Sequence, residues 1–156
     1  MSPRTVDDDP FRVFRSRRGR AVATTMGVLA VVIFGGLAVV LKTPAETGIW
    51  HTGDRVLVAG IGVAVAALCW RYATVRAVPT REGLEVRNLF TTRHLSWPQV
   101  VNVRYGGGAP WVTLDLDDTD TVAVMAIQRA DGAASDAEAS RLAALVQALG
   151  ETREPR

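Results

Sequence analysis

The sequence predicts a two-helix transmembrane hairpin followed by a small antiparallel β sandwich or partial barrel, capped by a C-terminal helix. Three observations lead to this fold class. Two uncharged apolar runs occur in the first half of the chain. Short segments that alternate apolar and polar residues follow, between residues 83 and 127. The last segment carries an apolar stripe at helical spacing.

Residues 1–20 are rich in arginine and are predicted to form a disordered basic tail. They hold six arginines and three aspartates. The apolar run that follows, residues 21–41, has twenty-one residues. At about 1.5 Å per residue, a helix of this length spans roughly 30 Å, the thickness of a bilayer's hydrocarbon core. We therefore predict transmembrane helix 1 over 21–41.

A cleaved export signal is the alternative for this first run. The apolar region of such a signal normally has about 7–15 residues and ends at a small-x-small site. Here the run is longer, and only the Thr-Pro-Ala sequence at 43–45 weakly resembles a cleavage site. A membrane anchor therefore fits this run better than a signal.

The second apolar run, Val56–Trp70, has fifteen residues, which is short for a membrane span. Arg55 and Arg71 flank it, and their long side chains can reach the two interfaces. Aromatic residues at its end suit an interfacial belt. We predict transmembrane helix 2 over 56–72; a buried helix of a soluble core is the alternative.

The flanking charges predict the orientation of the hairpin. Positively charged flanks stay in the cytoplasm, whereas the connecting loop 42–55 has two basic and two acidic residues. Both termini are therefore expected in the cytoplasm, with the loop outside the cell membrane. The residues expected to determine this topology are Arg15, Arg17, Arg18 and Arg20.

Both apolar runs carry small residues at helical spacing, which allow membrane helices to approach closely. These are Ala23, Gly27 and Gly35 in the first run, and Gly62 and Ala66 in the second. Packing of the two spans into one hairpin is the favoured interpretation. The alternative is a homo-oligomer that forms through these small-residue faces.

Residues 73–150 are predicted to form a cytoplasmic domain of about six short strands and one helix. Alternating apolar and polar residues, typical of half-buried strands, recur at regular spacing. The segments are 83–88, 91–96, 100–105, 111–118 and 121–127. Gly83 follows Glu82 in a predicted turn, where glycine is free to adopt a positive φ.

The C-terminal helix is predicted from a capping box and an apolar stripe. Ser135 with Glu138 fits the capping-box pattern at the start of a helix. Gly150 stands where a helix stop is expected. The stripe consists of Leu142, Leu145, Val146 and Leu149. Residues 151–156 are predicted to be a disordered tail.

The segments TREGLEVRN (80–88) and RHLSWPQVVNV (93–103), with the terminal helix, resemble the bacterial pleckstrin-homology-like (PH-like) domain. Two spans followed by this domain resemble actinobacterial membrane proteins described as PH domain-containing, a group that includes a low-molecular-weight protein antigen. The resemblance implies fold markers and no catalytic residue. These markers are Gly83, Leu95, Trp97 and Val100. The PH fold has seven strands, and about six are counted here.

The charge distribution indicates a surface that could face membrane lipids. Residues 71–104 hold six arginines and two glutamates, whereas residues 115–154 are mainly acidic. In eukaryotic PH domains the first hairpin binds phosphoinositide headgroups, but Glu82 and Glu85 would oppose a polyanion there. The candidate membrane-surface or lipid contacts are Arg71, Arg76, Arg81 and Arg87.

Enzyme and nucleic-acid functions find little support in the sequence. The formal net charge of +2 is small for a nucleic-acid binder. No pattern for a catalytic, cofactor or metal site is recognisable. The glycines at 106–108, for example, lack the Gly-Lys-Ser/Thr of a phosphate loop. The sequence therefore predicts an interaction module on a membrane protein, with an unknown protein partner or the membrane surface as its target. A receptor for anionic lipid headgroups is the alternative.

Overall fold

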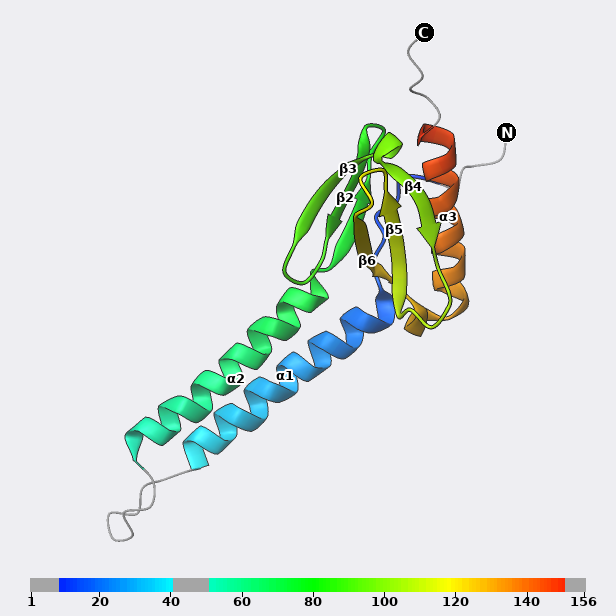
Figure 1. The fold of residues 1–156 in the computed structure, drawn as a ribbon. Helices are drawn as coiled ribbons and strands as arrows, with labels where there is room; N and C mark the ends of the chain where they lie inside the picture. The colour runs from blue at the N-terminus through cyan, green and yellow to red at the C-terminus, as the bar shows by residue number, and fades with distance from the viewer. Residues whose placement is uncertain (1–8, 41–50, 151–156) are drawn as a thin grey trace. The chain divides into compact units, whose positions relative to one another are not determined.

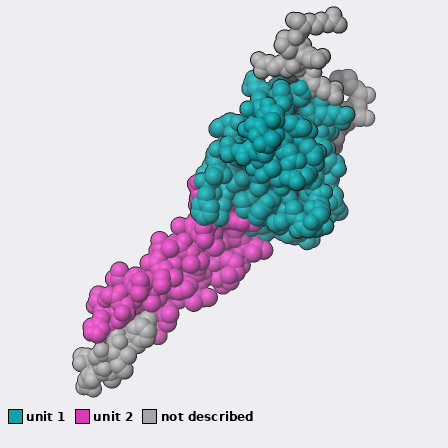
Figure 2. All heavy atoms as spheres, viewed as in Figure 1, with its two compact units in different colours: residues 1–19, 75–156 teal, residues 20–74 magenta. Residues whose placement is uncertain are grey.

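The computed structural model describes residues 9–40 and 51–150, and its elements are two helices, six strands and a C-terminal helix (Figure 1). The chain divides into two compact units, coloured separately in Figure 2. One unit is Arg20–Thr74. The other combines the residues up to Gly19 with those from Val75 onward. We call the second the sheet unit.

The two apolar runs form helices α1 (Arg17–Val40) and α2 (Thr52–Ala73). Both are long and apolar enough to cross a membrane. Each helix begins four residues before its predicted span, so residues 17–20 and 52–55 are helical and do not belong to a tail or a loop. Within α2 only Gly62 is buried. The rest of the predicted loop lies almost wholly outside the described residues.

Small residues pack α1 against α2 in antiparallel fashion. A Cβ atom at Gly62 would lie 2.5 Å from the Cβ of Phe34, and one at Gly27 would lie 3.2 Å from the Cβ of Cys69. Arg55 Nε donates a 2.9 Å hydrogen bond to the carbonyl of Ala38. Gly27 and Gly62 thus pack the hairpin, as predicted from the sequence.

The sheet unit contains two three-stranded antiparallel sheets, in the orders β1-β2-β3 and β4-β5-β6. Apolar side chains alternate along most strands because one face of each sheet is buried. The strands are β1 (Arg76–Pro79), β2 (Gly83–Arg87), β3 (Thr92–Ser96), β4 (Val100–Arg104), β5 (Trp111–Leu116) and β6 (Thr121–Gln128). The predicted strand count holds among the described residues, and β1 is the strand that no alternating pattern had located.

A shared core and one asparagine join the two sheets. Leu84 and Val86 of the first sheet cluster with Leu114 and Val124 of the second. The side-chain amide of Asn88, just after β2, donates to the Ala123 carbonyl at 2.7 Å. Its oxygen accepts the Met125 N–H at 3.2 Å. Asn88 therefore binds the end of one sheet to an edge of the other.

Helix α3 (Ala133–Gly150) covers the core with the predicted stripe. Leu142 and Leu145 are buried, and Val146 and Leu149 pack against the same cluster. The predicted capping box is wrong, because the helix begins two residues before Ser135. The Ser135 hydroxyl instead lies 2.6 Å from the Gly132 carbonyl, to which it donates.

Gly83 is a fold marker for a reason different from the predicted turn. It lies in β2 opposite Ser96 and does not have a positive φ. A Cβ atom at this position would lie 2.2 Å from the carbonyl oxygen of Leu95. Glycine is therefore required by the close approach of β3 and not by turn geometry.

Candidate functional site

Residues 9–16, which we call the N-terminal segment, are part of the sheet unit. Phe14 forms an isolated antiparallel bridge with Ala77 of β1. The Phe14 N–H donates to the Ala77 carbonyl at 2.9 Å, and the Ala77 N–H donates back at 3.1 Å. The Phe14 side chain is 0% exposed and belongs to the core cluster. The segment thus pairs with β1 at one residue, Phe14.

Arg141 of α3 holds the N-terminal segment in place. Its guanidinium carbon lies 3.8 Å from the centroid of the Phe14 ring, a cation–π contact. Its Nη1 donates to the carbonyls of Pro10 and Arg12, both at 2.8 Å. Glu138 pairs with this arginine and, at 2.5 Å, with Arg12. The segment is therefore bound to α3 through side chains and backbone together.

The prediction of a disordered tail over 1–20 is consequently wrong for residues 9–20. A disordered segment lacks the apolar side chains needed to offset its conformational entropy. Here Phe14 is buried, and Phe11 packs against the same core. The FRVF sequence at 11–14, with two of the four phenylalanines in the chain, was the signal that could have shown this.

The start of α1 is fixed to the same unit. The Ser16 hydroxyl accepts the Gly19 N–H at 2.9 Å, which is N-cap geometry. The Asp131 carboxylate accepts the Arg18 N–H at 3.0 Å. Arg18 Nη1 donates to the Ala130 carbonyl at 2.8 Å. Two oxygens thus satisfy free N–H groups of the first turn of α1.

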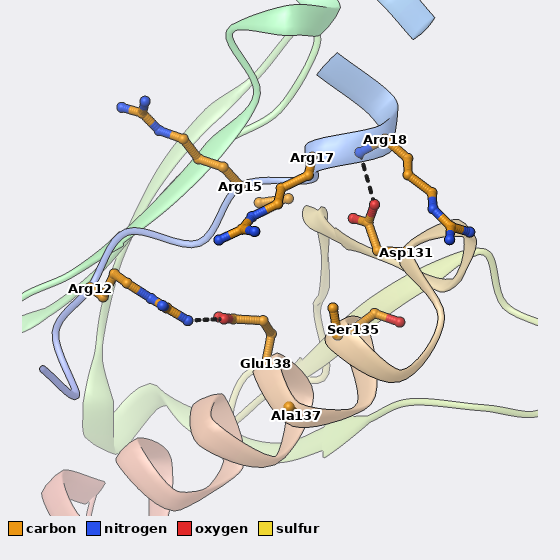
Figure 3. Close-up of a pocket in the computed structure, with 10 residues that line it drawn as sticks. Arg12, Arg15, Arg17, Arg18, Asp131, Ser135, Ala137 and Glu138 are labelled. Atoms are coloured by element: carbon orange, nitrogen blue, oxygen red, sulfur yellow. Dashed lines mark hydrogen bonds and ion pairs between the residues drawn. The ribbon is translucent and has the colours of Figure 1, made fainter. Parts of the chain in front are cut away.

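A pocket of about 410 Å³ lies between the N-terminal segment, the first turn of α1 and the start of α3. We call it the arginine pocket (Figure 3). Its charged lining consists of Arg12, Arg15, Arg17, Arg18, Asp131 and Glu138. Its volume lies within the range of small-ligand sites, roughly 300–1,000 Å³.

The arginine pocket has an excess of positive charge. Arg12 and Arg141 share Glu138, and Asp131 accepts a backbone N–H. Arg15 and Arg17 are exposed, and neither has a hydrogen bond or ion pair within the described residues. In Figure 3 the side chain of Arg17 extends across the pocket, whereas that of Arg15 points away from it. The first turn of α3, whose N-terminus is the positive end of the helix dipole, lines the opposite wall.

The sequence of the chain is similar to one protein family and to several mycobacterial proteins. Residues 74–144 match the model of the family described as "Bacterial PH domain". The chain is 33% identical over 111 residues to "Uncharacterized protein Rv1417" of Mycobacterium tuberculosis, and the match covers 71% of each chain. The chain belongs to the family of this mycobacterial protein, and its residues 74–144 are similar to the bacterial PH domain. "Uncharacterized protein Mb1452" of Mycobacterium bovis matches with the same identity and coverage. No solved structure matches the chain.

The match to the bacterial PH domain leaves out part of the sheet unit. It begins at residue 74, after both apolar helices, whereas Phe14 lies before them. All four arginines of the arginine pocket also lie before residue 74, outside the match. The sheet unit therefore includes residues that stand before α1 and α2 in the sequence, in addition to the residues that match the bacterial PH domain.

The predicted lipid-contact arginines do not form one cluster. Arg76 and Arg87 face each other across β1 and β2. Arg81 lies beyond the other end of this strand pair, in the connection between Pro79 and Gly83. Arg71 belongs to the last turn of α2, in the other unit. The structure therefore brings together Arg76 and Arg87, two like charges, and leaves Arg81 apart from them.

The remaining fold markers belong to the core of the sheet unit, and the burial predicted for Trp97 is confirmed. Trp97 is 1% exposed, and Leu95 and Val100 are also buried. Trp97 begins the short 3-10 helix η2 (Trp97–Gln99), and its indole N–H donates to the Thr80 carbonyl at 3.0 Å. This bond ties the indole to the β1–β2 connection.

Two acidic residues of the β5–β6 hairpin make ion pairs with arginines of other strands. Asp115 pairs with Arg104 at 2.7 Å, and Asp120 pairs with Arg93 at 3.3 Å. Across residues 9–40 and 51–150, no group of three or more His, Cys, Asp or Glu side chains is placed to hold a metal ion. These acids thus stabilise the surface of the two sheets.

Proposed function

We propose that this chain is an integral protein of the cell membrane that displays its PH domain in the cytoplasm as a non-catalytic interaction module. The module would bind a protein partner or the membrane surface. Two helices long and apolar enough to span a bilayer support the anchoring. The family match to a bacterial PH domain supports the role as an interaction module.

The pairing of Phe14 with Ala77 carries the proposed topology. Phe14 precedes α1 and Ala77 follows α2, yet both lie in one folded unit. If α1 and α2 cross the membrane, the chain must cross and return so that these residues meet on one side. The arginine-rich flanks favour the cytoplasm as that side.

Reporter fusions to the full chain test this topology. We expect an alkaline phosphatase fused at residue 48 to be active and one fused at the C-terminus to be inactive. A green fluorescent protein at the C-terminus should fluoresce. The opposite pattern, or release of the chain from membranes by alkaline carbonate, would refute the proposal. Neutralising Arg15, Arg17, Arg18 and Arg20 together should weaken the orientation, because they carry the positive flank.

The proposed protein also forms a homo-oligomer through the small residues of its apolar helices. A Cβ atom at Gly35 would have no neighbour within 4 Å, so this face of α1 is open to a second copy. In a Cys69→Ser background, Gly35→Cys should give a covalent dimer on oxidation in membranes. Gly53→Cys, at an equally open position near the start of α2, is the control. A chain that stays monomeric with Gly35→Cys would refute self-association through this face.

A further inference from the structure

We propose that the arginine pocket binds the phosphate of an anionic phospholipid headgroup. This inference rests on the proposed membrane anchoring. The pocket lies at the first turn of α1, and the apolar part of that helix begins at Ala21, three residues after Arg18. In an anchored chain, the covalent connection keeps the arginines of this turn within a few residues of the hydrocarbon boundary.

The charges of the pocket select an anion. Arg17 extends across it with no carboxylate partner in the described residues, and the exposed Arg15 can turn toward it by changing rotamer. A guanidinium presents a planar fork of N–H donors that matches two oxygens of a phosphate. The N-terminus of α3 adds a favourable field for an anion. The negative charge of Asp131 repels an anion. Because its Oδ1 accepts the backbone N–H of Arg18, this N–H group partly offsets that charge.

The arginine pocket is a different site from the β1–β2 hairpin, whose arginines the sequence predicted as lipid contacts. The hairpin has Glu85 between Leu84 and Val86, and its Arg81 stands apart from Arg76 and Arg87. The arginine pocket instead combines a cavity of about 410 Å³ with two arginines that no carboxylate neutralises. The geometry therefore favours the pocket over the hairpin as the headgroup site.

The test compares two variants that lose the same charge. Full-length protein in a neutral detergent is titrated with phosphatidylglycerol, and bound lipid is counted by native mass spectrometry. Arg15→Gln with Arg17→Gln should weaken binding about thirtyfold, because each substitution removes a charge-assisted hydrogen bond from a guanidinium to the phosphate. Arg81→Gln with Arg87→Gln, the matched control, should change it less than about threefold. Equal losses in both variants would indicate diffuse attraction and overturn the proposal.

Two further measurements identify the ligand and the mode of binding. Arg17→Lys keeps the charge but removes the planar fork, so it should weaken binding; unchanged affinity would contradict a phosphate pocket. Phosphatidylcholine should bind more weakly than phosphatidylglycerol. Equimolar inorganic phosphate should not displace phosphatidylglycerol; displacement would identify a soluble phosphate as the ligand and overturn the lipid assignment.

The anchoring and the headgroup site can fail separately. Each variant is first checked for thermal stability, for carbonate-resistant membrane integration and for the cytoplasmic C-terminal reporter. If the wild-type chain is not integrated, the proposed function fails. If it is integrated and the pocket variant still binds phosphatidylglycerol like the wild type, only the headgroup site fails.

Discussion

The guanidinium of Arg141, on the C-terminal helix, covers the ring of Phe14, near the start of the described chain, at 3.8 Å. Between these residues in the sequence lie both apolar helices and all six strands. The contact holds the N-terminal segment against the C-terminal helix of the sheet unit. A domain cut out after α2 would therefore lack a core side chain and the partner of its C-terminal helix.

Phe14→Ala should destabilise the domain by about 3–5 kcal/mol, because it removes a fully buried aromatic side chain. Phe14 is 0% exposed. Thermal and chemical unfolding of the full chain in detergent, followed by tryptophan fluorescence, measures the loss. The matched control is Phe90→Ala, since Phe90 is 76% exposed. It should cost less than about 0.5 kcal/mol. Similar stability of the two variants would show that the N-terminal segment is not part of the core.

Arg141→Met should lower the free energy of unfolding by about 2–3 kcal/mol, because two backbone carbonyls and a carboxylate lose their charged donor. These partners are Pro10, Arg12 and Glu138. Arg129→Met is the control, because the side chain of Arg129 is exposed. Hydrogen exchange measured by mass spectrometry should then show faster exchange over residues 9–16 in Arg141→Met alone. Unchanged protection there would contradict the clamp between α3 and the N-terminal segment.

Gly83→Ala should destabilise the sheet unit by about 3 kcal/mol, because the new methyl group would overlap the backbone of β3. The Cβ atom of the new alanine would lie 2.2 Å from the Leu95 carbonyl oxygen. Only a movement of the backbone can relieve this overlap. Gly150→Ala provides the control, since its Cβ would make only an ordinary contact at 3.6 Å. Paired melting curves of the two variants check this. If Gly83→Ala melts with the wild type, the glycine is not required by strand packing.

The elements predicted correctly from the sequence are those with a strong period. The apolar helices, the strands from Gly83 to Gln128 and the stripe of α3 all follow from the spacing of apolar residues. The burial of Trp97 followed from its place in the PH-like pattern. These features are local, so a window of about ten residues contains the information.

The features that were missed depend on contacts between distant segments. β1 has four residues, and its last is Pro79, which argues against a strand in any local pattern. Its pairing becomes favourable because β2 binds one edge and Phe14 the other. The arginine pocket likewise joins residues 12–18 to 131–138. Arginines beside an apolar run suggest topology from sequence alone, and only the fold shows that they also line a cavity.

Gly27 of α1 packs against Cys69 of α2. A Cβ atom at Gly27 would lie 3.2 Å from that of Cys69, close to the Cβ separation of a disulfide, about 3.5–4.5 Å. Gly27→Cys should therefore form an intramolecular disulfide with Cys69 on mild oxidation in membranes. Loss of both free thiols, measured by alkylation and mass spectrometry, reports the bond. Gly35→Cys should keep Cys69 free, because Gly35 has no neighbour within 4 Å on which such a bond could form.

A second substitution then tests what holds the helices together. In the Gly27→Cys chain, Gly62→Ile should prevent the disulfide, because a Cβ at Gly62 would lie 2.5 Å from that of Phe34 and force the helices apart. Gly60→Ile, on the same helix with open space around its Cβ, should leave the disulfide yield unchanged. A full yield with Gly62→Ile would mean that the close approach at Gly62 does not determine the hairpin. A reduced yield with Gly60→Ile would mean that the added side chain acts through the bilayer rather than through the contact with Phe34.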